Sequence, residues 1–251
     1  RIHTLVFGKT LKYHLLISDY LSNMKKLNKV FIIHYTKLEA RKAHMLRELE
    51  RWFPDTEHEF IEELDQEDLT QELIEQNFDL EAFEKRFDRK MLISEMSLCM
   101  KYKKVVNDIA NTEEGNHFFI LEDDVIFKED PLNYIESMNR LCYDNDLKYD
   151  CVFLGEALIR RGDNRDFFFK KDHPATNGLC TVLYTKEATN KLNTYLHSTK
   201  ITQPLDWEFN TAFKQMDFQV YWGKAITKHG SVLATEQEDL EYFKSTLRDS
   251  Y

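Results

Sequence analysis

FFILEDDVIF, residues 118–127, is the stretch that decides the fold, because four apolar residues run directly into three consecutive carboxylates. A short apolar run of this kind is typical of a buried β-strand. Carboxylates are costly beside a buried strand unless water or a cation solvates them. The segment therefore indicates either a solvated acidic turn or a metal site at the end of the strand.

Composition limits the class of protein. With 251 residues, of which 42% are hydrophobic, the chain can bury one large α/β core or at most two small ones. Seven Gly, four Pro and the absence of repeats favour one continuous domain over residues 29–251, preceded by an N-terminal extension over residues 1–28. No apolar run approaches the roughly 20 residues of a membrane span. The net charge of -10 argues against a general nucleic-acid binder.

Four cysteines are widely spaced, and none of them forms a C-x-x-C pair: Cys99, Cys142, Cys151 and Cys180. This spacing suggests neither a zinc ribbon nor a disulfide scaffold. We expect reduced thiols that lie mostly in the core, which favours a cytoplasmic location.

Apolar strands alternate with amphipathic helices along the chain. Strands are expected at residues 30–35, 57–64, 117–121, 150–154, 179–184 and 218–222, and helices at residues 37–53, 92–111, 185–196 and 206–213. Thr36, with Glu39 three residues later, forms the expected capping box of the first helix, and Thr185 is the expected cap of the third. Alternation of this kind predicts an α/β sheet with parallel strands and crossover helices. Ligands of such sheets bind beyond the carboxyl ends of the strands, where residues 122–124 fall.

The acidic trio has a definite expected geometry. An extended backbone directs Glu122 and Asp124 to one side and Asp123 to the other. Two carboxylates on one side repel each other unless a cation lies between them. Such oxygen ligands suit Mg²⁺ or Mn²⁺, which bridge carboxylates to substrate phosphates. Phosphatases, nucleases and nucleotide-sugar transferases remain open on this chemistry alone.

A series of segments, taken in order, resembles glycosyltransferase family 25. The series is VFIIHYTKLEARKAHM, LISEMSLCMKYKKVV, FFILEDDVIF, YDCVFLG, TNGLCTVLYTKEATNKL, PLDWEF and HGS, from about Val30 to Ser231. The chain departs from the family pattern where His34 replaces the usual Asn and where Lys101-Tyr102 replaces a common Ser-His pair.

The resemblance implies a GT-A type fold, that is, a Rossmann-like, mostly parallel sheet flanked by helices. It implies inverting transfer of a hexose, galactose or glucose, from a UDP-sugar donor to a hydroxyl. The expected acceptor is a glycan or a collagen-like hydroxylysine, and the expected cofactor is Mn²⁺ or Mg²⁺.

The resemblance also assigns roles in the metal site. Asp124 is the expected metal ligand, and Glu122 is the second acid of the site or a ribose contact. Asp123 contacts the donor or holds the loop by hydrogen bonds. His229 completes the metal coordination or forms hydrogen bonds within its loop.

Inversion requires a base that removes the proton of the acceptor hydroxyl. Asp206 is the first candidate for this base and Glu208 the second. Asp206 is equally a candidate helix N-cap, and the two roles are compatible. Trp207 is either a sugar-stacking platform or a core residue, and a core position is favoured.

Donor binding is expected to involve Arg41, Glu95 and Gly155. Arg41 faces the diphosphate or pairs with Glu48 on its own helix. Glu95 binds the donor or complements a helix dipole, and Gly155 permits close approach of the backbone. A loop that contains the adjacent pair Arg160-Arg161 is a candidate for closing on phosphate or for plain surface charge.

Two other functions remain open. A Mg²⁺-dependent phosphoesterase explains the acidic cluster, although it does not explain the ordered series of segments. A non-catalytic domain that binds a glycan or a nucleotide is compatible with the departure at Lys101-Tyr102.

Overall fold

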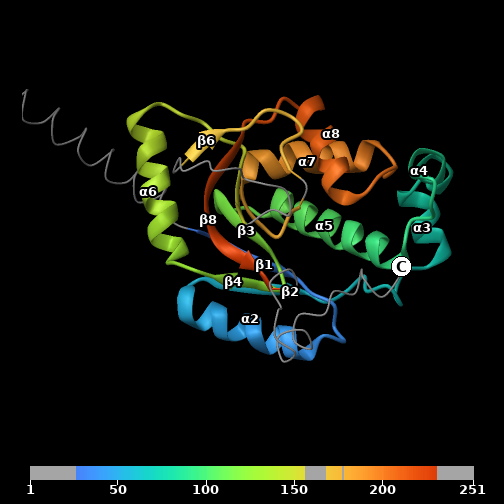
Figure 1. Ribbon diagram of the computed structural model, residues 1–251, viewed down its shortest axis with the longest axis horizontal. Coiled ribbons are helices and arrows are strands. Elements are labelled where there is room, and N and C mark those ends of the chain that lie inside the picture. Colours follow the sequence, from blue (N-terminus) through green and yellow to red (C-terminus); the bar gives the residue numbers. More distant parts are fainter. Residues whose placement is uncertain (1–26, 156–167, 177, 231–251) are drawn as a thin grey trace, which may run out of the picture.

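The computed structural model describes residues 27–155, 168–176 and 178–230, which form a mixed sheet of eight strands with helices on both faces (Figure 1). This arrangement confirms the predicted α/β class. The expected extension, apart from its last two residues, and the Arg160-Arg161 loop lie outside these ranges. Within the described residues, every helix is too short or too polar to cross a bilayer.

All of the predicted strands and helices form in the predicted order, and five further elements lie between them. In chain order, the elements are β1 (Lys29–Ile33), α2 (Glu39–Trp52), β2 (Glu57–Ile61), α3 (Gln71–Asn77), α4 (Leu80–Phe87), α5 (Ile93–Asn111), β3 (His117–Glu122), β4 (Val125–Phe127), α6 (Pro131–Asp144), β5 (Cys151–Gly155), β6 (Phe168–Lys170), β7 (Thr181–Thr185), α7 (Lys186–Ser198), α8 (Leu205–Gln215) and β8 (Val220–His229).

The strands are ordered β2-β1-β3-β7-β5-β8-β4 across the sheet, and β6 pairs with β8. Strands β1, β2, β3, β5 and β8 run in the same direction, whereas β7, β4 and β6 run against their neighbours. A parallel connection needs a crossover of a dozen or more residues, which is usually a helix. No helix is described between β5 and β7, and β7 enters the sheet antiparallel to both β3 and β5.

The sheet separates two hydrophobic cores because successive side chains of a strand point to opposite faces. Phe118 and Ile120 of β3 pack in the core formed with α5, α7 and α8. Phe119 and Leu121 pack in the core formed with α2 and α6. Each fully buried side chain of this size contributes roughly 1.5–3 kcal/mol. The apolar run of residues 118–121 therefore serves both cores and fixes β3 near the middle of the sheet.

Local signals at the helix starts were only partly correct. Thr185 caps α7 as predicted, since its side chain accepts a hydrogen bond of 3.1 Å from the Ala188 N–H. The predicted capping box at Thr36 is wrong. The N–H and the hydroxyl of Thr36 both donate to Asp65, which follows β2, and α2 begins without a side-chain cap. A tertiary contact thus takes the place of the local one.

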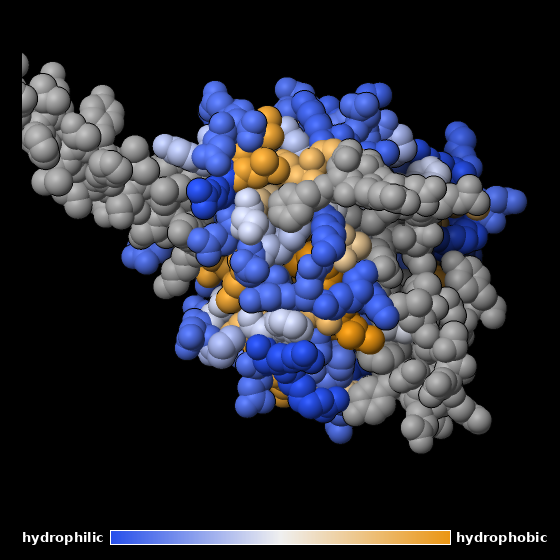
Figure 2. Space-filling view, turned by 60° about the vertical axis from the view of Figure 1, so that its left-hand side comes forward, coloured by the Kyte–Doolittle hydropathy of each residue, from blue (hydrophilic) through white to orange (hydrophobic). Residues whose placement is uncertain are grey.

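Polar side chains cover most of the coloured part of the face shown in Figure 2, and the hydrophobic areas on that part are small and scattered. All four cysteines are buried thiols that take part in no disulfide, as predicted.

His117, the first residue of β3, creates a pH dependence of stability. Its ring is buried against Tyr149, with centroids 5.9 Å apart, and burial lowers its pKa from 6.5 to about 4. The folded state therefore binds fewer protons than the unfolded chain between these two pH values, so stability falls as the pH falls through this window. We expect His117 to account for a loss of about 3 kcal/mol between pH 7 and pH 4.

Urea denaturation at a series of pH values measures this loss. The substitution His117→Phe should flatten the pH dependence of the unfolding free energy in that window. His197→Phe, at an exposed position on α7, is the matched control and should keep the wild-type slope. Equal slopes for wild type and His117→Phe would contradict the assignment.

Candidate active site

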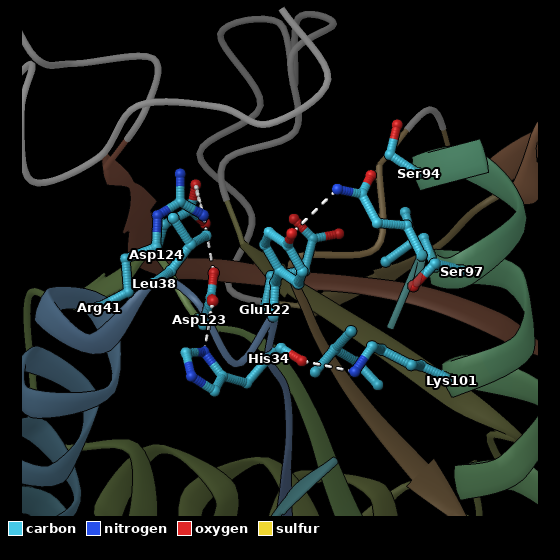
Figure 3. Close-up of a pocket in the computed structure, with 13 residues that line it drawn as sticks. His34, Leu38, Arg41, Ser94, Ser97, Lys101, Glu122, Asp123 and Asp124 are labelled. Atoms are coloured by element: carbon cyan, nitrogen blue, oxygen red, sulfur yellow. Dashed lines mark hydrogen bonds and ion pairs between the residues drawn. The ribbon is translucent and has the colours of Figure 1, made fainter. Parts of the chain in front are cut away.

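A cavity of about 150 Å³ opens beyond the carboxyl ends of β1 and β3, between α2 and α5 (Figure 3). Its lining consists of Ile33, His34, Tyr35, Leu38, Arg41, Gln66, Ser94, Ser97, Leu98, Lys101, Glu122, Asp123 and Asp124. The cavity therefore lies where ligands of α/β sheets bind. It brings together four of the residues selected from the sequence, namely Arg41 and the acidic trio.

The acidic trio does not have the expected alternating geometry. Strand β3 ends at Glu122, and Asp123 and Asp124 form a turn before β4 begins at Val125. Because the backbone turns, all three carboxylates line the cavity, and Asp123 does not point away from it. In Figure 3, Asp124 lies beside Arg41, whereas Glu122 lies on the side of Ser94 and Ser97.

Asp123 is held by two side chains, one for each oxygen. His34 Nδ1 donates to Oδ2 at 2.7 Å, and Arg41 Nη1 donates to Oδ1 at 2.7 Å. The same Arg41 nitrogen lies 3.6 Å from Asp124 Oδ2. All four side chains are buried, so the ion pairs act in a low dielectric where charges interact strongly. These contacts match the hydrogen-bonding role proposed for Asp123.

Arg41 thus stands at the cavity wall, on the first turn of α2. The alternative partner considered for it was Glu48. Glu48 instead accepts a hydrogen bond of 2.8 Å from the backbone N–H of Phe127 in β4.

Lys101 explains one departure from the family pattern. Its side chain is buried, and Nζ donates to the carbonyls of His34 at 2.6 Å and Ile61 at 2.9 Å. Nζ also forms an ion pair of 2.7 Å with Asp65 Oδ1. Lys101 therefore ties α5 to the ends of β1 and β2 beneath the cavity.

Further polar contacts hold another part of the cavity wall. The Tyr35 hydroxyl donates to Glu67 at 2.7 Å, and the Gln66 side chain donates to the Tyr35 hydroxyl at 2.9 Å. Ser97 Oγ donates to the Leu64 carbonyl at 2.7 Å. These bonds fasten the loops after β1 and β2 to each other and to α5.

Buried polar atoms of the cavity wall include His34 Nε2 and Ser94 Oγ, for which the described residues supply no hydrogen-bond partner. Buried polar groups are normally satisfied, so such atoms are suited to a polar ligand. Sequence reasoning missed Ser94, Tyr35 and Gln66. The available signal was their position on the segments that follow or face the strand ends.

Asp206 lies in the first turn of α8 and is coupled to the acids. Burial raises the pKa of its carboxyl group, and the negative charges of Glu122 and Glu95 raise it further. Asp206 itself is not among the residues that line the cavity. Pro204 occupies the N-cap position, so Asp206 is not the N-cap of α8.

Glu208, the second candidate base, is buried and already occupied. One oxygen accepts a hydrogen bond of 2.6 Å from the Tyr195 hydroxyl, and the other accepts one of 3.2 Å from the Thr202 N–H. These contacts are typical of a structural carboxylate.

The favoured core position of Trp207 is wrong, because 49% of this residue is exposed. It follows Asp206 in the first turn of α8, where one face of the helix meets solvent.

Glu95 and Gly155 lie outside the acidic cavity. Glu95 forms a two-pronged ion pair with Arg89, with both distances 2.7 Å, and accepts a hydrogen bond from the Leu92 N–H at the start of α5. Gly155 ends β5, where a Cβ atom would clash with Cys180 Sγ. Close packing against Cys180 therefore accounts for a glycine at this position. Donor contact by either residue stays a prediction.

The backbone of His229 lies next to the acidic turn. His229 pairs with Val125 across β8 and β4, and the Gly230 N–H donates to the Asp124 carbonyl at 2.7 Å. Its side chain lies outside the described residues, so its role in metal binding stays a prediction.

The described residues contain no group of three or more His, Cys, Asp or Glu side chains arranged to hold a metal ion. The donor set at the cavity is the pair of carboxylates of Glu122 and Asp124. This set fits a hard divalent cation such as Mg²⁺, which usually binds one or two carboxylates together with waters and substrate phosphates.

A carboxylate-lined cavity beyond the ends of parallel strands is typical of α/β enzymes that act on phosphorylated ligands. The model of glycosyltransferase family 25 (LPS biosynthesis protein) matches residues 27–214. The match covers well over half of the chain, so the protein belongs to this family and is a glycosyltransferase by family.

Two solved structures resemble the chain at low sequence identity. A197 from STIV is 13% identical with a TM-score of 0.41, over 81% of this chain and 85% of that one. A putative glucose-1-phosphate thymidylyltransferase from Bacillus anthracis, in complex with a sucrose, is 11% identical with a TM-score of 0.40, over 89% of this chain and 96% of that one. No curated protein matches the chain.

We predict that Lys101→Met destabilises the protein by about 3–5 kcal/mol, because it leaves the buried Asp65 carboxylate and two carbonyls without their cation. Urea denaturation measures the loss. Lys104→Met on the same helix removes a more exposed lysine and should cost less than about 1 kcal/mol.

The double variant Lys101→Met/Asp65→Asn tests the cause. Removing the second charge should recover part of the loss. If the double variant is no more stable than Lys101→Met, the ion pair is not the reason for the effect.

Proposed function

We propose that the protein is a metal-dependent, inverting glycosyltransferase that moves a hexose, galactose or glucose, from a UDP-sugar to an acceptor hydroxyl. Membership of family 25 supports sugar transfer. The observation that carries the rest is the cavity at the carboxyl ends of β1 and β3, with Glu122 and Asp124 on its wall.

The nucleoside of the donor is proposed to bind in this cavity. Ile33, Leu38 and Leu98 supply apolar surface for a flat heterocycle. Ser94 Oγ and His34 Nε2 supply buried polar atoms without a partner among the described residues. A heterocycle with carbonyl and N–H groups at its edge matches this combination of walls.

The diphosphate is proposed to lie toward Asp124 and Glu122, which would hold Mn²⁺ or Mg²⁺. When bound, such a cation offsets the negative charge that develops on the departing UDP. Arg41, at the same wall, keeps the acidic turn in position through Asp123.

Asp206 is proposed as the base. The acceptor oxygen attacks the anomeric carbon, the bond from that carbon to the diphosphate oxygen breaks, and its electron pair leaves with UDP. The hydroxyl proton passes to the Asp206 carboxylate. Burial and the neighbouring acids raise the pKa of Asp206, which makes it a stronger proton acceptor than an ordinary carboxylate. The acceptor is proposed to be a glycan or a collagen-like hydroxylysine.

Calorimetry with UDP and assays of UDP release test the donor and the metal. We expect UDP binding that strengthens with Mn²⁺, and release of UDP from UDP-galactose or UDP-glucose that requires the metal. Asp124→Asn should weaken metal-dependent UDP binding about tenfold or more, because the amide is a poorer cation ligand. Asp144→Asn, an exposed change on α6, is the control and should have no effect.

Other outcomes separate the alternatives. If the rate of UDP release does not depend on the metal and is unchanged by Asp124→Asn, the proposed metal role is excluded. UDP binding without turnover of any donor would favour a binding domain. Phosphate release from simple esters would favour a phosphoesterase.

We predict that Asp206→Asn lowers turnover by about 10²–10⁴-fold and leaves UDP binding unchanged. Because the base must be ionised, the wild-type rate should rise with pH through the raised pKa of Asp206, and this rise should disappear in the variant. Loss of UDP binding in Asp206→Asn would instead assign this residue to the donor or the metal.

A further inference from the structure

Trp207 is the most exposed large apolar side chain among the described residues, with 49% of its surface accessible. An indole of this size in contact with water gains little for folding. Exposed tryptophans are enriched where one molecule binds another, because they offer a large contact area. The position of Trp207 therefore points to a ligand rather than to the core.

The ring is held in place from one side by α4. Phe87 meets it edge to face, with centroids 5.5 Å apart. The Cζ atom of Arg86 lies 5.9 Å from the centroid of the Trp207 ring and 5.5 Å from the centroid of the Phe87 ring. These contacts order the indole before any ligand arrives, which lowers the entropic cost of binding. No carboxylate of the described residues forms an ion pair with Arg86.

Trp207 is the neighbour in sequence of Asp206, the proposed base. Trp207 directly follows Asp206, and consecutive helical side chains point about 100° apart around the axis. Neither residue is among those that line the cavity, and the negative charge of Glu122 raises the pKa of Asp206. A ligand stacked on Trp207 would therefore lie next to the proposed base and outside the cavity proposed for the donor.

We propose that Trp207 and Arg86 form the acceptor subsite and bind a sugar ring of an oligosaccharide. The C–H face of the sugar stacks on the indole, and Arg86 donates hydrogen bonds to its oxygens. This assignment rests on the proposed function, in which Asp206 deprotonates the acceptor.

Charge favours a saccharide over a hydroxylysine peptide at this subsite. Arg86 already occupies the cation position near the indole. The ammonium group of hydroxylysine would meet a like charge there, which is unfavourable at short range. A sugar ring brings no positive charge, and its hydroxyl oxygens accept hydrogen bonds from the guanidinium.

The full chain, with UDP and Mn²⁺, is tested for binding to an array of oligosaccharides that end in neutral hexose, heptose or uronic acid. A collagen-type hydroxylysine peptide is a separate arm. We expect binding to at least one oligosaccharide, and Trp207→Ala should weaken it about tenfold or more. Trp207→Phe should stay within about threefold, because it keeps an aromatic face. Tyr143→Ala, which removes an exposed aromatic ring on α6, is the matched control.

UDP affinity is measured in parallel and should be unchanged in every Trp207 variant. If wild type binds UDP but no saccharide, or if Trp207→Ala binds saccharide as tightly as wild type, the acceptor subsite is wrong and the proposed function stands. Binding of the peptide that depends on Trp207 would overturn the choice of a saccharide. If wild type does not bind UDP, the proposed function itself fails.

Discussion

The site depends on one constraint, which is that a buried carboxylate must be paired. Asp123 satisfies it with His34 on one oxygen and Arg41 on the other. The two contacts join the turn after β3 to the loop after β1 and to the first turn of α2. Two segments that lie 82 to 89 positions apart in sequence are thereby held in one arrangement, and the carboxylates of Glu122 and Asp124 stay at the cavity wall despite their mutual repulsion.

A second buried charge, beneath the cavity, is also paired. Lys101 is buried and compensated by Asp65 and by two strand-end carbonyls. Its ammonium group adds hydrogen bonds at the ends of β1 and β2, where the His34 N–H also donates to the Ile61 carbonyl. The region around the cavity is thus built from paired charges, whereas the two cores on either face of the sheet are built from apolar packing. Hydrogen-bonded charge pairs fix the orientation of side chains more strictly than apolar contacts do, and a site with positioned acids requires such fixed orientations.

Local pattern predicted the main strands and helices, but not α3, α4, α6 or the short strands β4 and β6. The strand at residues 118–121, the helix α5 and the Thr185 cap follow from periodicity and capping, which depend on neighbours in sequence. The errors occurred where a distant group intervened. Asp65 takes the hydroxyl of Thr36 away from its expected cap, and Trp207 packs against α4 at the surface instead of in the expected core.

The sequence by itself determined the α/β class, the acids after β3 and the family resemblance, because each of these depends on short segments of contiguous residues. Only the tertiary structure decided which carboxylate is paired, that Glu208 is occupied by Tyr195, and that Asp206 lies within the field of Glu122. The physical reason is that burial and charge coupling depend on distances between segments. Such distances are set when the helices pack on the sheet, and a local sequence pattern does not predict them.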